Sequence, residues 1–161
     1  MRKYFGLALL FLIISCQKNK EEVKTKNLVN KDEVLAAVNK IRKAGCKCGE
    51  VTYAPTGQVT WNQNLEDAAL YHSEDMSQNN YFAHVAPNGE TPADRVTKFG
   101  YQYLGFGENL YAAFGFSPTA TEVVENWKNS QTHCTNLMNP KFKEMGVANF
   151  NNYWTQILGY K

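Results

Sequence analysis

The order of the periodic segments constrains the fold of this chain more than any other feature of its sequence. Segments with helical spacing come first, and strand-like segments come last. The last two, residues 145–149 and 153–158, carry apolar and aromatic side chains on either side of a turn at Asn151-Asn152, which is typical of a β-hairpin. This order predicts an α+β fold, in which helices cover an antiparallel sheet, rather than a doubly wound parallel sheet.

Capping residues and helical spacing place the first two helices. Asn30 can cap a helix with Glu33 three residues later, and Gly45 ends it. A second helix is expected over about residues 63–78, where largely apolar positions recur at helical spacing. This stripe predicts an inward-facing histidine, and its members are Leu65, Ala69, His72 and Met76.

Two pairs of a hydroxyl residue and a proline predict the starts of two later helices. Thr91-Pro92 combines a cap with proline at the first helical position and opens a short helix that closes near Gly100. Ser117-Pro118 repeats this arrangement. The helix that follows it is expected to bury one stripe of apolar residues: Ala120, Val123, Val124 and Trp127.

The N-terminus is laid out like a signal peptide over residues 1–15. Arg2 and Lys3 precede a largely apolar run over residues 4–14, which is shorter than the roughly 20 residues that a membrane-spanning helix needs. The sequence Ile13-Ile14-Ser15-Cys16 resembles a bacterial lipobox, so we expect cleavage before Cys16 and acylation of this residue. An ordinary secretory signal with a chance cysteine is the alternative. The expected location is the bacterial cell envelope, on the extracytoplasmic side.

Composition divides the remaining chain into a tether and one domain. Residues 16–26 follow the cleavage site and are polar and mixed in charge, so they cannot bury enough apolar surface to order themselves. Residues 27–161 are enough for one sizeable core, without a second composition break. The chain has 17 basic and 15 acidic residues, and removing Arg2 and Lys3 balances them. Because no basic face is evident, nucleic acid is not an expected partner.

Three cysteines remain for the domain, and an exported protein can keep a disulfide. They are Cys46, Cys48 and Cys134. A bridge between Cys46 and Cys48 would be tightly strained, so we expect Cys134 to pair with one of these two. A structural zinc cluster of the three cysteines with His133 is an alternative, although its spacing fits poorly.

One carboxylate and three histidines are the candidates for chemistry. Glu108 lies in an otherwise apolar run and must be paired or hydrogen-bonded if it is buried. His72 fits a core residue, whereas His84 and His133 stand in polar, turn-like contexts that suit ligand binding or catalysis. A purely structural role for Glu108, tying down a loop, is equally consistent with these residues alone.

A series of short motifs runs in order through the domain. They are Trp61-Asn62, His72 to Met76, Asn80 to His84, Gly107-Glu108-Asn109, Val123 to Trp127, Ser130 to His133, Asn139-Pro140, Glu144 to Val147 and Tyr153 to Gln156. In this order and spacing they resemble the CAP superfamily, which comprises cysteine-rich secretory, antigen 5 and pathogenesis-related proteins. The resemblance implies a three-layer α-β-α sandwich with a central antiparallel sheet and a cleft on one side.

The resemblance also implies cleft residues. Eukaryotic relatives line the cleft with two histidines and two acids, and motif matching assigns His84 and Glu108 to the first of each. This sequence departs at the other two positions, which are Ser130 and Tyr153. Many bacterial members instead carry a histidine at the position of His133, which is therefore the expected second imidazole. Glu125 is the nearest substitute acid, although the five-residue offset from Ser130 turns it away around the helix.

Three functions follow as expectations. The first is a binding module for a lipid or sterol-like ligand or a partner protein, which the aromatic residues around Glu108 favour. The second is a divalent-metal site, because two imidazoles and a nearby carboxylate suit Zn²⁺ or a similar ion. The alternative is a metal-assisted, peptidase-like hydrolase that uses the same cleft; the chain lacks the Gly-x-Ser-x-Gly motif of serine hydrolases.

Overall fold

The structure is a computed structural model that describes Met1 and residues 29–161. The predicted signal peptide after Met1, the predicted lipidation site Cys16 and the predicted tether lie outside the described residues. The elements in chain order are α1 (Lys31–Ala44), β1 (Cys46–Cys48), β2 (Val51–Tyr53), β3 (Thr60–Trp61), α2 (Gln63–Gln78), α3 (Pro92–Lys98), β4 (Gly105–Ala112), α4 (Ala120–Asn129), α5 (Gln131–Met138), β5 (Glu144–Phe150) and β6 (Tyr153–Tyr160).

The main sheet has the strand order β3-β5-β6-β4. The three long strands pair antiparallel, as predicted, whereas the two-residue β3 pairs parallel with β5. Asn151 and Asn152 both adopt positive φ angles of 48° and 66°, which suits the tight turn between β5 and β6. Because β6 lies between β5 and β4, β4 forms an edge of the sheet.

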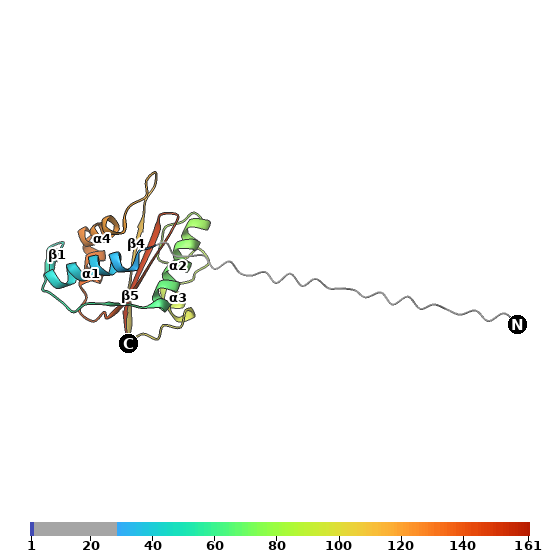
Figure 1. The fold of residues 1–161 in the computed structure, drawn as a ribbon, viewed down its shortest axis with the longest axis horizontal. Helices are drawn as coiled ribbons and strands as arrows, with labels where there is room; N and C mark the ends of the chain where they lie inside the picture. Colours follow the sequence, from blue (N-terminus) through green and yellow to red (C-terminus); the bar gives the residue numbers. More distant parts are fainter. Residues whose placement is uncertain (2–28) are drawn as a thin grey trace.

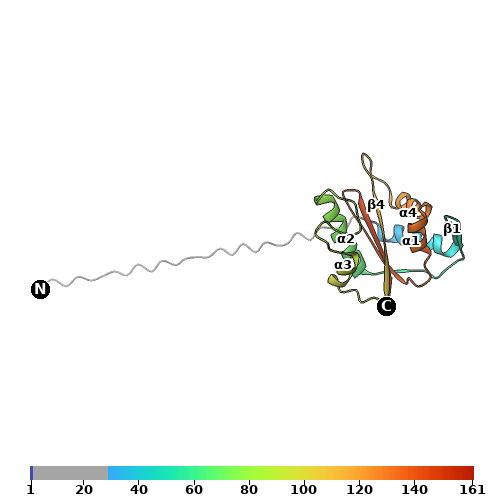
Figure 2. The same cartoon turned by 180° about the vertical axis from the view of Figure 1, so that it is seen from behind.

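Helices cover both faces of this sheet (Figures 1 and 2), with α2 and α3 on one side and α1 and α4 on the other. The alternating side chains of the strands build two cores. Ile157 and Ala148 pack in the core formed with α2 and α3, whereas Leu158 and Val147 pack in the core formed with α1, α4 and α5. The predicted α+β class with three α-β-α layers is therefore confirmed.

The helix boundaries follow their caps. The side chain of Asn30 accepts a hydrogen bond from the Glu33 amide, and α1 ends before Gly45, as predicted. The second helix has the predicted bounds, and its inward face, including His72, is buried. Thr91 and Asp94 form a reciprocal capping box at the start of α3.

Two expectations about local structure were wrong. Ser117-Pro118 does not open α4, because Thr119 caps this helix through a capping box with Glu122. His133 does not lie in a turn but in α5, whose eight residues carry no periodic signal strong enough to be seen in the sequence. The strand β4 was also missed, because its run around Glu108 does not alternate between apolar and polar residues.

One glycine allows α2 to lie directly on the sheet. A Cβ atom on Gly146 of β5 would lie 2.1 Å from the Glu66 backbone nitrogen and 2.4 Å from the Leu65 carbonyl carbon. No side chain can occupy this position unless the helix moves. In the part of the chain that the structure describes, no helix combines the length and hydrophobicity needed to cross a membrane.

Candidate functional site

Glu108 of β4 is buried and paired at both carboxylate oxygens. His84 Nδ1 donates to Oε1 at 2.7 Å, and Arg95 Nη2 donates to Oε2 at 3.0 Å. The Glu108 side chain is only 3% exposed. The expectation that a buried acid here needs a partner is met by these two groups, one neutral or cationic and one always cationic.

Arg95 is the residue that organises this pair. Its fully buried guanidinium also donates to the carbonyl oxygen of His84 at 2.8 Å and to that of Glu90 at 3.3 Å. One side chain of α3 therefore fixes both the Glu108 carboxylate and the loop that carries His84. Sequence reasoning missed Arg95, and the only signal was a basic residue next to the apolar Val96 in a short helix.

His84 lies in the segment between α2 and α3 and faces outward. Its side chain is 53% exposed although Nδ1 is bound to Glu108. Because a carboxylate accepts a hydrogen bond at Nδ1, the neutral ring carries its proton there and presents the Nε2 lone pair to the outside. His84 is therefore prepared to act as a ligand or a base.

His72 of α2 contacts the segment that carries His84. Its Nε2 donates to the carbonyl oxygen of Ala83 at 3.0 Å, directly before His84, and the Tyr81 hydroxyl lies 3.5 Å from Nδ1. The Tyr81 hydroxyl in turn donates a hydrogen bond to the Asp75 carboxylate. Burial lowers the pKa of His72, so this ring is neutral at neutral pH. This arrangement agrees with the predicted core role of His72.

His133 comes from the other helical layer, in the first turn of α5. Burial lowers the pKa of His133, and the charge of a protonated His84 lowers it further. The two rings therefore lie within electrostatic reach of each other. The edge strand β4 contacts both elements, α3 through Glu108 and α5 through Asn109.

Hydrogen bonds from two asparagines hold α5 against β4. Asn109 Nδ2 donates to the carbonyl oxygen of His133 at 3.2 Å, and Asn136 Nδ2 donates to that of Glu108 at 3.2 Å. Asn136 also donates to Asn109 Oδ1 at 2.9 Å. Successive residues of a strand point to opposite faces, so Glu108 serves the α3 side while Asn109 serves the α5 side.

Glu125 does not share these contacts. It lies on α4, pairs with Lys128 at 2.9 Å, and acts electrostatically on Cys46. Its surroundings are thus those of the cysteines, and we do not include it among the residues proposed to act with His84.

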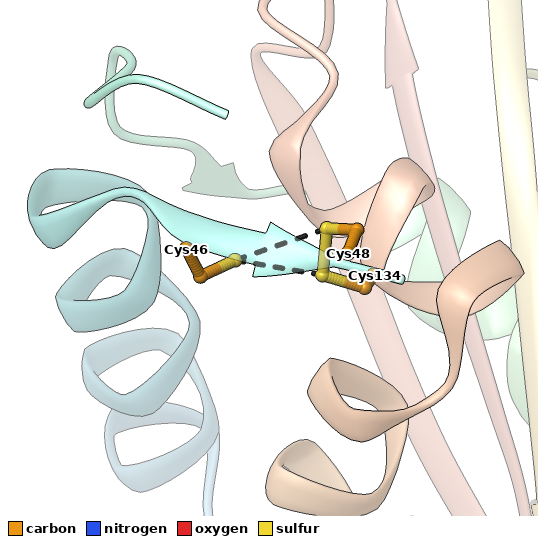
Figure 3. Close-up of side chains that lie close together, drawn as sticks. All are labelled: Cys46, Cys48 and Cys134. Carbon is orange, nitrogen blue, oxygen red and sulfur yellow. Dashed lines mark hydrogen bonds between the residues drawn. A yellow bond between two sulfur atoms is a disulfide. The ribbon is translucent and has the colours of Figure 1, made fainter. Parts of the chain in front are cut away.

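The cysteines form the predicted disulfide, between Cys48 and Cys134, with a Cα–Cα distance of 5.4 Å. Cys46 is free, and its sulfur lies 3.4 Å from that of Cys134 (Figure 3). Among the described residues, these three are the one group of histidine, cysteine or acidic side chains with three candidate ligand atoms within 4.8 Å of one another. His133 is not part of that group, and two of the three sulfurs in it are already bonded to each other in the disulfide.

Apolar side chains are exposed beside His84. Phe82 and Val85 flank it in the sequence and are 52% and 49% exposed. The aromatic residues expected near Glu108 divide into three groups. Tyr101 is buried, Phe114 and Phe116 are exposed beyond the end of β4, and the others are partly buried: Tyr103, Phe106 and Tyr111.

Comparison with known proteins gives a match to one family along most of the domain. Residues 35–156 match the sequence model of CAP, the Cysteine-rich secretory protein family. The chain is 36% identical over 97 residues to "Uncharacterized protein YkwD" of Bacillus subtilis (strain 168), covering 59% of this chain and 37% of that protein. It is 34% identical over 99 residues to "Uncharacterized membrane protein YlbC" of the same organism, covering 62% of this chain and 28% of that protein.

Solved structures share the fold. An extracellular protein containing a SCP domain from Bacillus anthracis str. Ames superposes with a TM-score of 0.70 at 28% identity, covering 81% of this chain and 40% of that one. The crystal structure of NaASP2 with Zn²⁺ superposes with a TM-score of 0.52 at 13% identity, covering 80% of this chain and 77% of that one. The matched region is thus well under half of the two Bacillus subtilis relatives and of the Bacillus anthracis protein.

Proposed function

This chain belongs to the CAP family of cysteine-rich secretory proteins, and we propose that it is a lipid-anchored, extracytoplasmic binding protein whose His84 and His133 hold a divalent metal ion such as Zn²⁺. The observation that carries the proposal is the hydrogen bond from His84 Nδ1 to the buried Glu108 carboxylate. Histidines that bind metals commonly donate their second ring nitrogen to a carboxylate in this way, which fixes the tautomer and makes the ligating nitrogen more basic.

The donor set fits two protein ligands rather than three. Glu108 is not free to coordinate because both of its oxygens are engaged, so its role is to orient His84. His133 supplies the second imidazole, and its lowered pKa favours the neutral ring that can bind a metal ion. The other coordination positions are left to water or to a bound ligand, for which a zinc ion offers Lewis acidity. The structure of NaASP2 with Zn²⁺ supports this proposal by analogy of fold.

The chemistry beside His84 also points to a class of ligand. Phe82 and Val85 expose apolar surface next to the proposed metal ligand. An amphipathic molecule with an anionic head and an apolar tail would satisfy both features, the head at the metal and the tail on these side chains. A fatty acid is the simplest probe of this kind.

Zinc titration of the chelator-stripped full chain by calorimetry tests the metal site. We expect one saturable site in the wild type, its loss in His84→Ala and in His133→Ala, and an affinity about 10- to 100-fold lower in Glu108→Gln. Glu125→Gln removes the same charge outside the site and should bind zinc like the wild type. Equal zinc binding by the wild type, His84→Ala and His133→Ala would refute the proposal, provided that circular dichroism shows folded variants.

Membrane anchoring is tested separately, in the bacterial cell. Incorporation of labelled palmitate should occur in the wild type and be absent in Cys16→Ser, because Cys16 is the proposed acylation site. The relative described as a membrane protein lends support to an envelope location. Labelling of Cys16→Ser at the wild-type level would argue for a different anchor.

We rank metal-assisted hydrolysis below binding. The carboxylate that would act as a base is held by His84 and Arg95 and is buried, so it has no free oxygen for a water molecule. Ser73 donates to Thr155 in the core and is not placed to act as a nucleophile. Hydrolysis would therefore depend on the proposed metal and His84 alone.

A further inference from the structure

The three cysteines come together because of strand geometry. Cys46 and Cys48 are two residues apart on β1, so their side chains share one face, and Cys134 of α5 faces them. The Cys46 sulfur lies 3.4 Å from the Cys134 sulfur and 3.9 Å from the Cys48 sulfur (Figure 3). A free thiol is thus in contact with both atoms of the disulfide.

The three sulfurs differ in their access to solvent. Cys48 and Cys134 are almost completely buried, whereas Cys46 is partly exposed. An external thiol cannot reach the disulfide directly in the folded protein. It can reach Cys46.

We propose that Cys46 makes this cluster a thiol–disulfide exchange site for low-molecular-weight thiols. The Cys46 thiolate attacks Sγ of Cys134, the nearer sulfur, so that a Cys46–Cys134 bond forms, the Cys48–Cys134 bond breaks, and Cys48 leaves as a thiolate that takes up the proton lost by Cys46. Attack on Cys48 is disfavoured because it would join two residues of a three-residue strand. No oxidant or reductant is consumed in this step.

In the new isomer, one sulfur of the disulfide belongs to the partly exposed Cys46. An external thiolate attacks Cys46, forming a mixed disulfide and releasing Cys134 as a thiolate. A second external thiolate then attacks the external sulfur of the mixed disulfide, which frees Cys46 and yields the oxidised external disulfide. In sum, two small thiols are oxidised to one disulfide, and Cys48 and Cys134 become thiols.

The burial of Cys46 and the charges around it determine the rate of this exchange. Burial raises the pKa of the Cys46 thiol, while Lys128 of α4 lowers it and Glu125 of the same helix raises it. Only the thiolate attacks, so exchange is slow at neutral pH and accelerates as the pH rises. The Cys48–Cys134 disulfide is therefore buried, and Cys46 provides the route by which it can be reduced.

The test is the rate of reduction of the full chain, purified in detergent, by a small dithiol. Samples are quenched with acid, alkylated and digested with trypsin, which cuts after Lys47 and so places Cys46 and Cys48 on different peptides. We expect Cys46→Ser to lose its disulfide at least about tenfold more slowly than the wild type, because the accessible sulfur is gone. Thr52→Ala, on the paired strand β2, should be reduced at the wild-type rate.

A second variant tests the alternative pairing directly. Cys48→Ser should form the Cys46–Cys134 disulfide and leave neither thiol open to alkylation in the folded protein. Two free thiols in Cys48→Ser under conditions in which the wild type keeps its disulfide would overturn the proposal. Equal reduction rates for the wild type and Cys46→Ser would do so as well.

Discussion

Replacing Arg95 by methionine should destabilise this protein more than the sequence context of Arg95, a basic residue in a short helix, would indicate. Methionine keeps much of the length of the side chain but removes the charge that faces Glu108. The guanidinium is fully buried and the Glu108 side chain is 3% exposed, so the variant would leave a carboxylate without its cationic partner in the interior. Breaking a buried pair in this way costs about 3–5 kcal/mol of unfolding free energy.

For a domain of this size, 1 kcal/mol corresponds to about 4 °C in Tm, so Arg95→Met should melt about 12–20 °C below the wild type. The assay is thermal unfolding followed by circular dichroism at pH 8. Adding Glu108→Gln should recover part of the loss, because it removes the stranded charge. A double variant no more stable than Arg95→Met would refute the idea that the stranded carboxylate causes the damage.

Three further predictions concern His133 and Gly146. Burial lowers the pKa of His133, and the charge of a protonated His84 lowers it further. In His84→Ala this pKa should therefore rise, measured by the His133 ring proton resonances in an NMR titration. An unchanged midpoint would mean that the two rings do not interact. The pKa of His133 is lowered in the folded state, so the unfolded chain binds a proton more readily at this residue. The contribution of neutral His133 to the free energy of unfolding should therefore be complete above pH about 6.5 and be lost as the pH falls through the lowered pKa, measured by urea unfolding. Gly146→Ala should cost more than about 3 kcal/mol in the same assay, because the new methyl group meets the α2 backbone. Gly57→Ala, whose Cβ would have its nearest neighbour at 4.0 Å, should be nearly neutral.

The sequence predicts those parts of the fold that local chemistry determines. Asn30 and Thr91 cap helices through bonds that span three residues, and the Asn151-Asn152 turn requires only that two adjacent residues tolerate positive φ angles. The strand β4 and the helix α5 were missed because their stability comes from partners distant in the chain. An isolated helix of eight residues is not stable, so α5 forms through its contacts with the rest of the domain and its own sequence needs no strong helix signal.

The residues of the candidate site also differ in whether the sequence alone could reveal them. Glu108 could be singled out because an acid in an apolar run demands a partner, and the family resemblance added His84 and His133. Arg95 escaped notice because a helical arginine is ordinary in sequence. It becomes informative only when its burial and its bond to Glu108, 13 residues later, are known. The choice of Cys48 over Cys46 as the disulfide partner likewise depends on how β1 faces α5.

His133 and Cys134 are adjacent in α5, so the proposed metal site is directly connected to the cysteine cluster. Because α5 is too short to hold its own position, His133 depends on the disulfide at Cys134, on the bond from Asn109 to the His133 carbonyl oxygen, and on Arg42, which donates to the Leu137 carbonyl oxygen at 2.6 Å. Cys134→Ala should therefore lower zinc affinity as well as reduce stability by about 2–5 kcal/mol. Cys46→Ala removes a sulfur from the same cluster but no tether, and its zinc affinity should match the wild type. Unchanged zinc affinity in Cys134→Ala would mean that the hydrogen bonds alone position His133.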